Sequence, residues 1–141
     1  MQINYISILV ASVLQFALGS LWYSPVIFGK LWMRIMETTH LPKEELQKIQ
    51  KEMIPFYALQ FLLTMITTSI FAIFIFISKT YNIGMSVSMI AIFVWLGFIM
   101  PTQIGTVLWG KTNKKFWLKQ ICVMVSYQLA AIIIASFVLM F

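Results

Sequence analysis

The chain has 141 residues, of which 61% are apolar and 10% are charged, and its mean hydropathy is +0.92. Soluble domains average about 45–50% apolar and about 25% charged residues, so this composition excludes a soluble globular domain and a disordered chain. The single cysteine, Cys122, also excludes a disulfide scaffold. We therefore predict an integral membrane protein.

Four continuous apolar runs are long enough to cross a bilayer as helices, which takes about 20 residues. None contains an ionisable Asp, Glu, Lys, Arg or His. Lipid leaves no partner for free backbone groups, so continuous runs of this length predict helices rather than strands. We predict an all-α bundle of four transmembrane helices in a single domain, with spans at about 3–22, 54–77, 85–109 and 120–141.

The basic residues predict the orientation of the chain. Nine of the ten lie in two loops, 23–53 and 110–119, and the exception is Lys79. Positive loops stay in the cytoplasm, so both termini are expected on the non-cytoplasmic side of a plasma or inner membrane. The net charge of +6 then reflects topology and attraction to anionic headgroups, and it predicts no nucleic-acid partner.

Aromatic residues fall at the predicted cytoplasmic boundaries, where amphipathic rings prefer to lie. We expect them to anchor the bundle at the membrane interface. They are Trp22, Tyr23, Trp32, Trp109 and Trp117.

The first cytoplasmic loop contains a predicted amphipathic helix at about 42–53. Pro42 suits the first turn of a helix, and Leu46, Ile49 and Met53 form a narrow apolar stripe. We expect this helix to lie on the cytoplasmic membrane surface. The same loop holds the only histidine, His40, which with scattered glutamates offers too few ligands for a zinc site. We predict no metal and no cofactor.

Each predicted span contains a glutamine, and the four amides lie roughly 9–12 Å from the cytoplasmic helix ends at 1.5 Å per residue. Nearby hydroxyls join them at similar depths. Two interpretations are open: hydrogen bonds that hold the helices together, or a polar cavity that opens toward the cytoplasm. The candidate residues are Gln15, Gln60, Thr64, Thr102, Gln103 and Gln128.

Pro101 lies inside the third predicted span and cannot donate to the carbonyl of Gly97, which predicts a kink or hinge. Gly97 and Gly105 are small enough to allow close helix approach. Ser12 and Gly19, seven residues apart on one face of the first span, suggest the same.

The spans lack the intramembrane carboxylate on which proton-coupled transport normally depends. The sequence also contains no nucleophile–base pair, zinc-protease motif or glycine-rich phosphate loop. We therefore expect a protein that is not an enzyme.

A faint duplication links the ends of the first and third spans. Gly19-Ser20-Leu21-Trp22 is followed by Gly29-Lys30, and Gly105-Thr106-Val107-Leu108-Trp109 by Gly110-Lys111. This pattern suggests two parallel helical-hairpin repeats. The segments Leu18–Pro25 and Phe28–Lys30 and the residue Trp32, with Trp95–Phe98, Pro101-Thr102 and Trp109–Lys111, are similar to the family of proteins of unknown function numbered 1761. The resemblance implies a small four-helix membrane protein and no assigned activity.

Two functions fit these patterns. The first is a homo-oligomeric channel or carrier for a neutral or weakly charged solute, with the glutamine layer as its path. The second is a structural or regulatory subunit that packs against another membrane protein.

Overall fold

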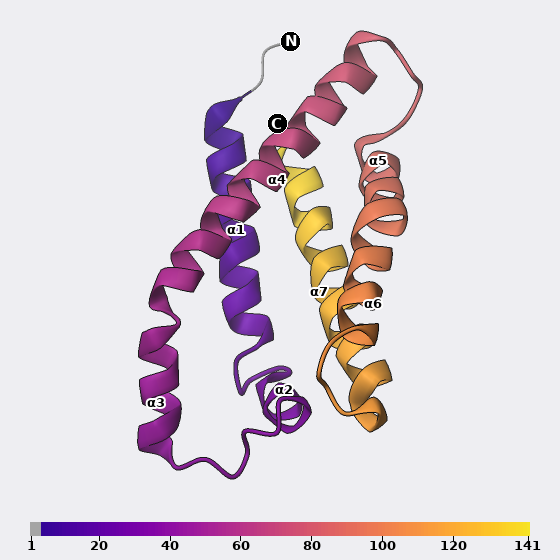
Figure 1. Cartoon of the computed structure of the whole chain (residues 1–141). Helices are drawn as coiled ribbons and strands as arrows, with labels where there is room; N and C mark the ends of the chain where they lie inside the picture. Colours follow the sequence, from indigo (N-terminus) through magenta and orange to yellow (C-terminus); the bar gives the residue numbers. More distant parts are fainter. Residues whose placement is uncertain (1–3) are drawn as a thin grey trace.

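The computed structural model describes residues 4–141, and its long elements are helices (Figure 1). Four stretches are long and apolar enough to span a membrane. They are α1 (Tyr5–Trp22), α4 (Ile54–Thr80), the succession of α5 (Val87–Val94), a π-helical turn (Trp95–Ile99) and α6 (Met100–Leu108), and α7 (Trp117–Val138) preceded by a 3₁₀ turn (Lys114–Phe116). The predicted four-helix fold is confirmed.

The ends of the helices differ by a few residues from the predicted boundaries. The predicted first span starts at residue 3, which lies outside the described residues. Asn4 caps α1, because its side chain accepts hydrogen bonds from the backbone N–H groups of Ile6 and Ser7 at 3.0 and 3.2 Å. α4 continues past Lys79 and α7 begins before Lys119, since a long lysine side chain can reach the membrane surface from within a helix.

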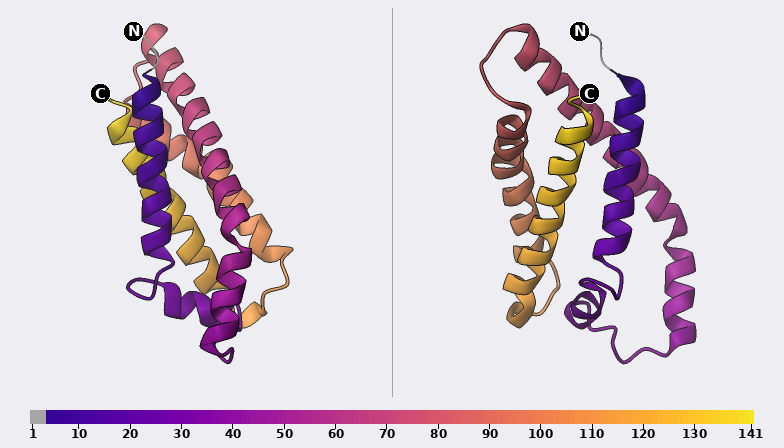
Figure 2. Two further views of the ribbon diagram at one scale, coloured as in Figure 1. Left: turned by 90° about the vertical axis from the view of Figure 1, so that its left-hand side faces the viewer. Right: turned by 180° about the vertical axis from the view of Figure 1, so that it is seen from behind.

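α1 and α7 form the centre of the molecule and pack extensively on each other. α4 packs against α1, and the third span packs against α7. Figures 1 and 2 show α4 close to the start of α5 at one end of the bundle and far from α6 at the other. We call these the terminal end, toward which residues 4 and 141 lie, and the loop end, where α2 (Gly29–Ile35) and α3 (Lys43–Glu52) lie.

The main cluster of buried apolar side chains, which we call the apolar core, lies in the terminal half of the bundle, and Ile35, Val107 and Val123 are buried separately toward the loop end. Helices α1, α4, α5 and α7 all contribute to this core. Its buried members are Ala11, Phe71, Ile75, Val87, Ile90, Ala91, Ile132 and Ala135. In contrast, α4 has no buried residue from 54 to 67, so α4 splays away from the other helices toward the loop end.

The predicted loop helix exists, but its direction differs from the expectation. α3 runs nearly along the direction of α1 in Figures 1 and 2, not across it as a helix lying flat on a membrane surface would. The reason is its short junction with α4, since Met53 alone separates the two helices. The apolar stripe stays largely uncovered, with Ile49 and Met53 exposed.

Small residues allow close packing in α1 but not in the third span. A Cβ atom on Gly19 would lie 2.8 Å from the Tyr127 hydroxyl oxygen, and Ser12 is fully buried, as predicted. The expectation for Gly97 and Gly105 is wrong, because added Cβ atoms there would meet nothing within 4 Å. Gly97 is exposed and Gly105 is half-buried, and neither is in close contact with another helix.

The irregularity predicted at Pro101 takes the form of a π-helical turn. The five residues Trp95–Ile99 form this turn directly before Pro101, and the N–H of Met100 bonds to the carbonyl of Trp95 five residues back. The wider turn accommodates a ring that cannot donate to Gly97. Whether the segment acts as a hinge stays a prediction.

Candidate intramembrane binding site

A hydrogen bond between Gln15 and Thr68 joins α1 to α4 in the middle of the bundle. The Gln15 Nε2 donates to the Thr68 Oγ1 at 2.7 Å and to the Ala11 carbonyl of its own helix at 3.2 Å. Thr68 in turn donates to the Thr64 carbonyl at 2.8 Å. Both side chains are buried, so this pair matches the interpretation that polar groups hold the helices together.

The same pair lies on the wall of a cavity of about 260 Å³. For comparison, an engineered apolar cavity of about 150 Å³ holds benzene. The lining comes from all four membrane-spanning stretches and is mainly apolar. It consists of Gln15, Ile66, Thr67, Thr68, Ile70, Phe71, Phe74, Val94, Ile99, Gln128, Ile132 and Ala135. None of these residues is ionisable, so the cavity suits an uncharged molecule.

Gln128 of α7 contributes the one lining amide that is not used to hold helices together. Its half-buried side chain makes no hydrogen bond to any part of the chain that the structure describes. Thr67 bonds only to the Leu63 carbonyl of its own helix, at 3.0 Å. An amide has donors and an acceptor, so Gln128 can bind a hydroxyl or a carbonyl inside an apolar space.

The predicted layer of four glutamines is not assembled. Gln15 and Gln128 share the cavity, but Gln103 does not line it. Gln60 is exposed, so it fits neither a hydrogen bond between helices nor a place in the cavity wall. Thr64 and Thr102 bond to carbonyls one turn back in their own helices, Gln60 and Phe98. Glutamines at equal depths along their helices need not point toward one another, because depth does not determine how each helix is rotated about its own axis.

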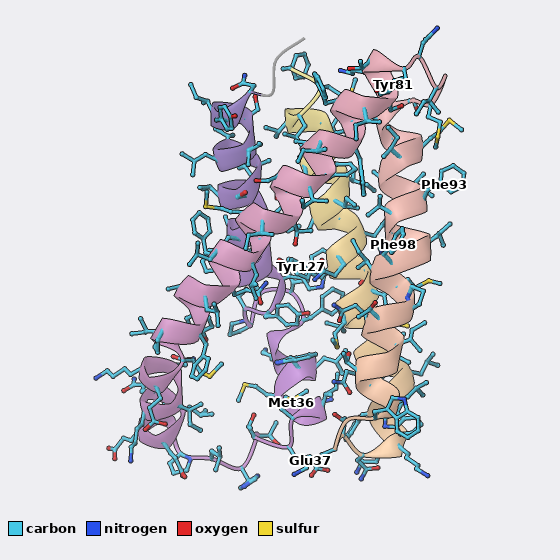
Figure 3. The ribbon with its side chains drawn as sticks, turned by 45° about the horizontal axis from the view of Figure 1, so that its top comes forward. Met36, Glu37, Tyr81, Phe93, Phe98 and Tyr127 are labelled. Carbon is cyan, nitrogen blue, oxygen red and sulfur yellow. The ribbon has the colours of Figure 1, made fainter. Side chains whose placement is uncertain are left out.

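Three of the five predicted interface anchors are turned toward the protein. Trp22 and Tyr23 pack against Tyr127 with ring centroids 6.3 and 5.6 Å apart, and Trp32 packs against Tyr23 at 4.8 Å. Figure 3 shows Tyr127 in the interior, whereas Phe93 and Phe98 point away from the bundle. Trp109, which is 92% exposed, has the free surface that an anchor needs.

The aromatic cluster at the loop end fixes α2 beneath α7. Burial, together with the neighbouring Tyr127, raises the pKa of Tyr23 to about 12, so its hydroxyl stays protonated even in alkaline solution. Trp117 instead donates to the Thr112 carbonyl at 3.0 Å and lies under the Lys114 ammonium at 5.7 Å. The predicted anchors at this end therefore stabilise the loops as well.

Sequence reasoning missed most of the cavity wall. Part of this wall lies in uniformly apolar runs, where the sequence does not show which side chains face a cavity. The residues concerned are Phe71, Phe74, Val94 and Ile99. One signal was available, because Trp95 lies in the middle of a span. Its indole Nε1 donates to the Val125 carbonyl of α7 at 3.1 Å, and Trp95 is the first residue of the π-helical turn.

The fold and this site define a multi-pass helical membrane protein with an uncharged intramembrane cavity. The family model described as "Protein of unknown function (DUF1761)" matches residues 6–140. The chain belongs to this family, as the resemblance of its motifs indicated. Comparison with curated proteins and with solved structures gives no match.

Proposed function

We propose that the protein is a non-enzymatic membrane carrier that binds a small uncharged amphiphile in the cavity between α1, α4, α5 and α7. The apolar wall takes the body of the ligand, and the Gln128 amide takes its hydrogen-bonding head. The unpaired Gln128 side chain in an apolar cavity is the observation that supports this most strongly. Pockets of this kind use few polar groups to orient a ligand.

The chemistry of the cavity wall narrows the class of solute, which the sequence predicted to be neutral or weakly charged. A wholly apolar molecule would leave the Gln128 amide in the cavity wall without a hydrogen-bond partner. A charged molecule would leave its charge unpaired in the cavity, which is costly. A neutral molecule with an apolar part and a polar head satisfies both limits.

Uptake of monobutyrin, a small uncharged amphiphile, tests this proposal. Influx into proteoliposomes is followed by stopped-flow light scattering and compared with protein-free liposomes. We expect the protein to raise the rate, Gln128→Leu to lower it toward the protein-free value, and Gln103→Leu to leave it unchanged. Equal rates for the native protein and Gln128→Leu would contradict the proposal.

A second candidate is a structural subunit that associates through α3, as a homo-oligomer or with another membrane protein. The exposed stripe of Ile49 and Met53 favours it. In membranes treated with mild oxidant, Ile49→Cys should form a disulfide-linked dimer if copies associate there. Gln47→Cys, about 200° round the helix at 3.6 residues per turn, is the control. Absence of the dimer argues against self-association through α3.

We further propose that the lysine-rich loops face the cytoplasm and anionic headgroups, with both termini on the opposite side. The distribution of basic residues supports this orientation. Lys114→Cys marks the loop end and should be labelled by an impermeant reagent only from the cytoplasmic side. Labelling only from the opposite side would reverse the orientation.

A further inference from the structure

We infer that one face of α4 forms a water-accessible path from the loop end to the cavity, while the terminal end is sealed. The path consists of Gln60, Thr64 and Thr67. The inference rests on the proposed function, because a cavity that holds a solute needs an entrance, but its test requires no solute.

The first observation is the register of the polar residues along α4. Gln60, Thr64 and Thr67 are spaced by four and three residues, so they lie on one face of the helix. Thr67 lines the cavity, and Gln60 lies about two turns nearer the loop end at 3.6 residues per turn. The polar face therefore leads from the cavity toward the loop end.

The second observation is that this face is uncovered. Gln60 and Thr67 are exposed and Thr64 is half-buried. Within residues 4–141 the side chain of Gln60 has no hydrogen-bond partner, and Thr64 bonds only to its own helix. A polar side chain left in lipid costs free energy, whereas water satisfies it, so the exposed amide favours water in this space.

The third observation is the packing at the opposite end of the cavity. Phe71, Ile132 and Ala135 line the cavity and also belong to the apolar core. Behind them the core is completed by buried Ile75, Ile90 and other apolar side chains. The buried members of this core are apolar, so the cavity wall on the terminal side is a barrier to water.

Figures 1 and 2 show the arrangement that produces this asymmetry. α4 meets α5 at the terminal end and diverges from α6 toward the loop end. A carrier that opens to one side and is closed by packed side chains on the other has this arrangement. We assign the structure to the state that is open toward the loops.

Cysteine labelling in nanodiscs tests the inference directly. Cys122 is exposed, so every variant carries Cys122→Ser. Single variants Gln60→Cys and Thr67→Cys report the path, and Ala91→Cys reports the core. Leu62→Cys is the matched control, since Leu62 is exposed but lies about 200° from Gln60 round the helix.

The reagent is a charged, water-soluble thiosulfonate, and Lys114→Cys and Thr80→Cys give the full rate at the two ends. We expect Gln60→Cys and Thr67→Cys to react within about tenfold of the full rate. Ala91→Cys and Leu62→Cys should be roughly 100-fold slower, because a charged reagent is excluded from the bilayer interior to that degree. Adding Gln60→Trp should slow labelling of Thr67→Cys and show that entry is from the loop end.

Several results would overturn the inference. Equally slow labelling of Gln60→Cys, Thr67→Cys and Leu62→Cys would show that lipid or another protein covers the face. Labelling of Ala91→Cys as fast as Thr67→Cys would show that the terminal end is open. If Gln60→Cys and Thr67→Cys are labelled as expected but monobutyrin is not taken up, transport of monobutyrin is refuted and the water-accessible path stands. Failure of the proposed function can therefore be distinguished from failure of this inference.

Discussion

The indole N–H groups of Trp22 and Trp95 donate to carbonyls only two residues apart on α7. Trp22 Nε1 lies 3.2 Å from the Val123 oxygen, and Trp95 Nε1 lies 3.1 Å from the Val125 oxygen. One tryptophan comes from the end of α1 and the other from the π-helical turn. α7 is therefore held by a tryptophan from each half of the chain.

Replacing either tryptophan should loosen α7. Trp22→Phe and Trp95→Phe each remove an indole donor, and we expect each to lower the free energy of unfolding by about 1–2 kcal/mol. Steric trapping in bicelles measures this quantity. Trp109→Phe is the control, because Trp109 is 92% exposed and should change it by less than about 0.5 kcal/mol. Equal effects of all three would refute the role of the two indoles.

Gly19 leaves room for the ring of Tyr127. Gly19→Ala would place a Cβ 2.8 Å from the tyrosine oxygen and 3.2 Å from the ring, so we expect a loss of about 1–3 kcal/mol from overpacking. Tyr127→Phe in the same chain should recover part of the loss, because it removes the nearest atom. Gly105→Ala meets no atom within 4 Å and should stabilise the helix, by at most about 1 kcal/mol. The reverse order of stabilities would contradict the packing.

Gly29 holds the turn that places α2. A Cβ at this position would lie 2.5 Å from the Ser24 carbonyl carbon and 2.6 Å from the Tyr23 oxygen, and backbone atoms cannot yield as side chains do. We expect Gly29→Ala to release α2 at a cost of about 2 kcal/mol, or roughly 30-fold more local opening. Trypsin cleavage after Lys30 or Arg34 reports this opening. Unchanged cleavage, as expected for Gly97→Ala, would show that the turn tolerates the change.

The bond between Gln15 and Thr68 should contribute to the packing of α1 on α4. Thr68→Val keeps the shape of the side chain but removes the acceptor, and we expect a loss of about 0.6–2 kcal/mol. Thr67→Val is the matched control, because Thr67 bonds only within its own helix. A double-mutant cycle with Gln15→Leu isolates the pair. A coupling energy of zero between Gln15 and Thr68 would mean that the loss of stability comes from contacts other than their hydrogen bond.

The architecture was predictable because it depends on one-dimensional patterns. Four apolar runs determine four helices, and the loops that contain Lys30 and Lys114 lie at the same end of the bundle in Figure 1, as the prediction of four spans requires. Ser12 and Gly19 were recognised as packing positions because close approach needs small residues. These inferences need only length, hydropathy and side-chain size.

The site depends on the rotation of each helix, which the sequence constrains weakly. Uniformly apolar spans carry little amphipathic signal, so the exposed position of Gln60 and the shared position of Gln15 and Gln128 at one cavity could not be derived. The divergence of α4 from α6 likewise depends on packing between distant segments, such as Phe71 with Ile132. Similar distances from the helix ends predicted a layer of four glutamines, but Gln60 is exposed and Gln103 does not line the cavity.

The central claim is that the cavity binds an uncharged amphiphile through the Gln128 amide. Its most direct test is NMR of ¹⁵N-labelled protein in nanodiscs, with the Gln128 side-chain resonance assigned by Gln128→Leu and followed as 1-hexanol is added. We predict a saturable shift of that resonance with little change at Gln103, and no saturable shift with hexane. A Gln128 resonance that does not move, or that moves equally with hexane, would contradict the claim.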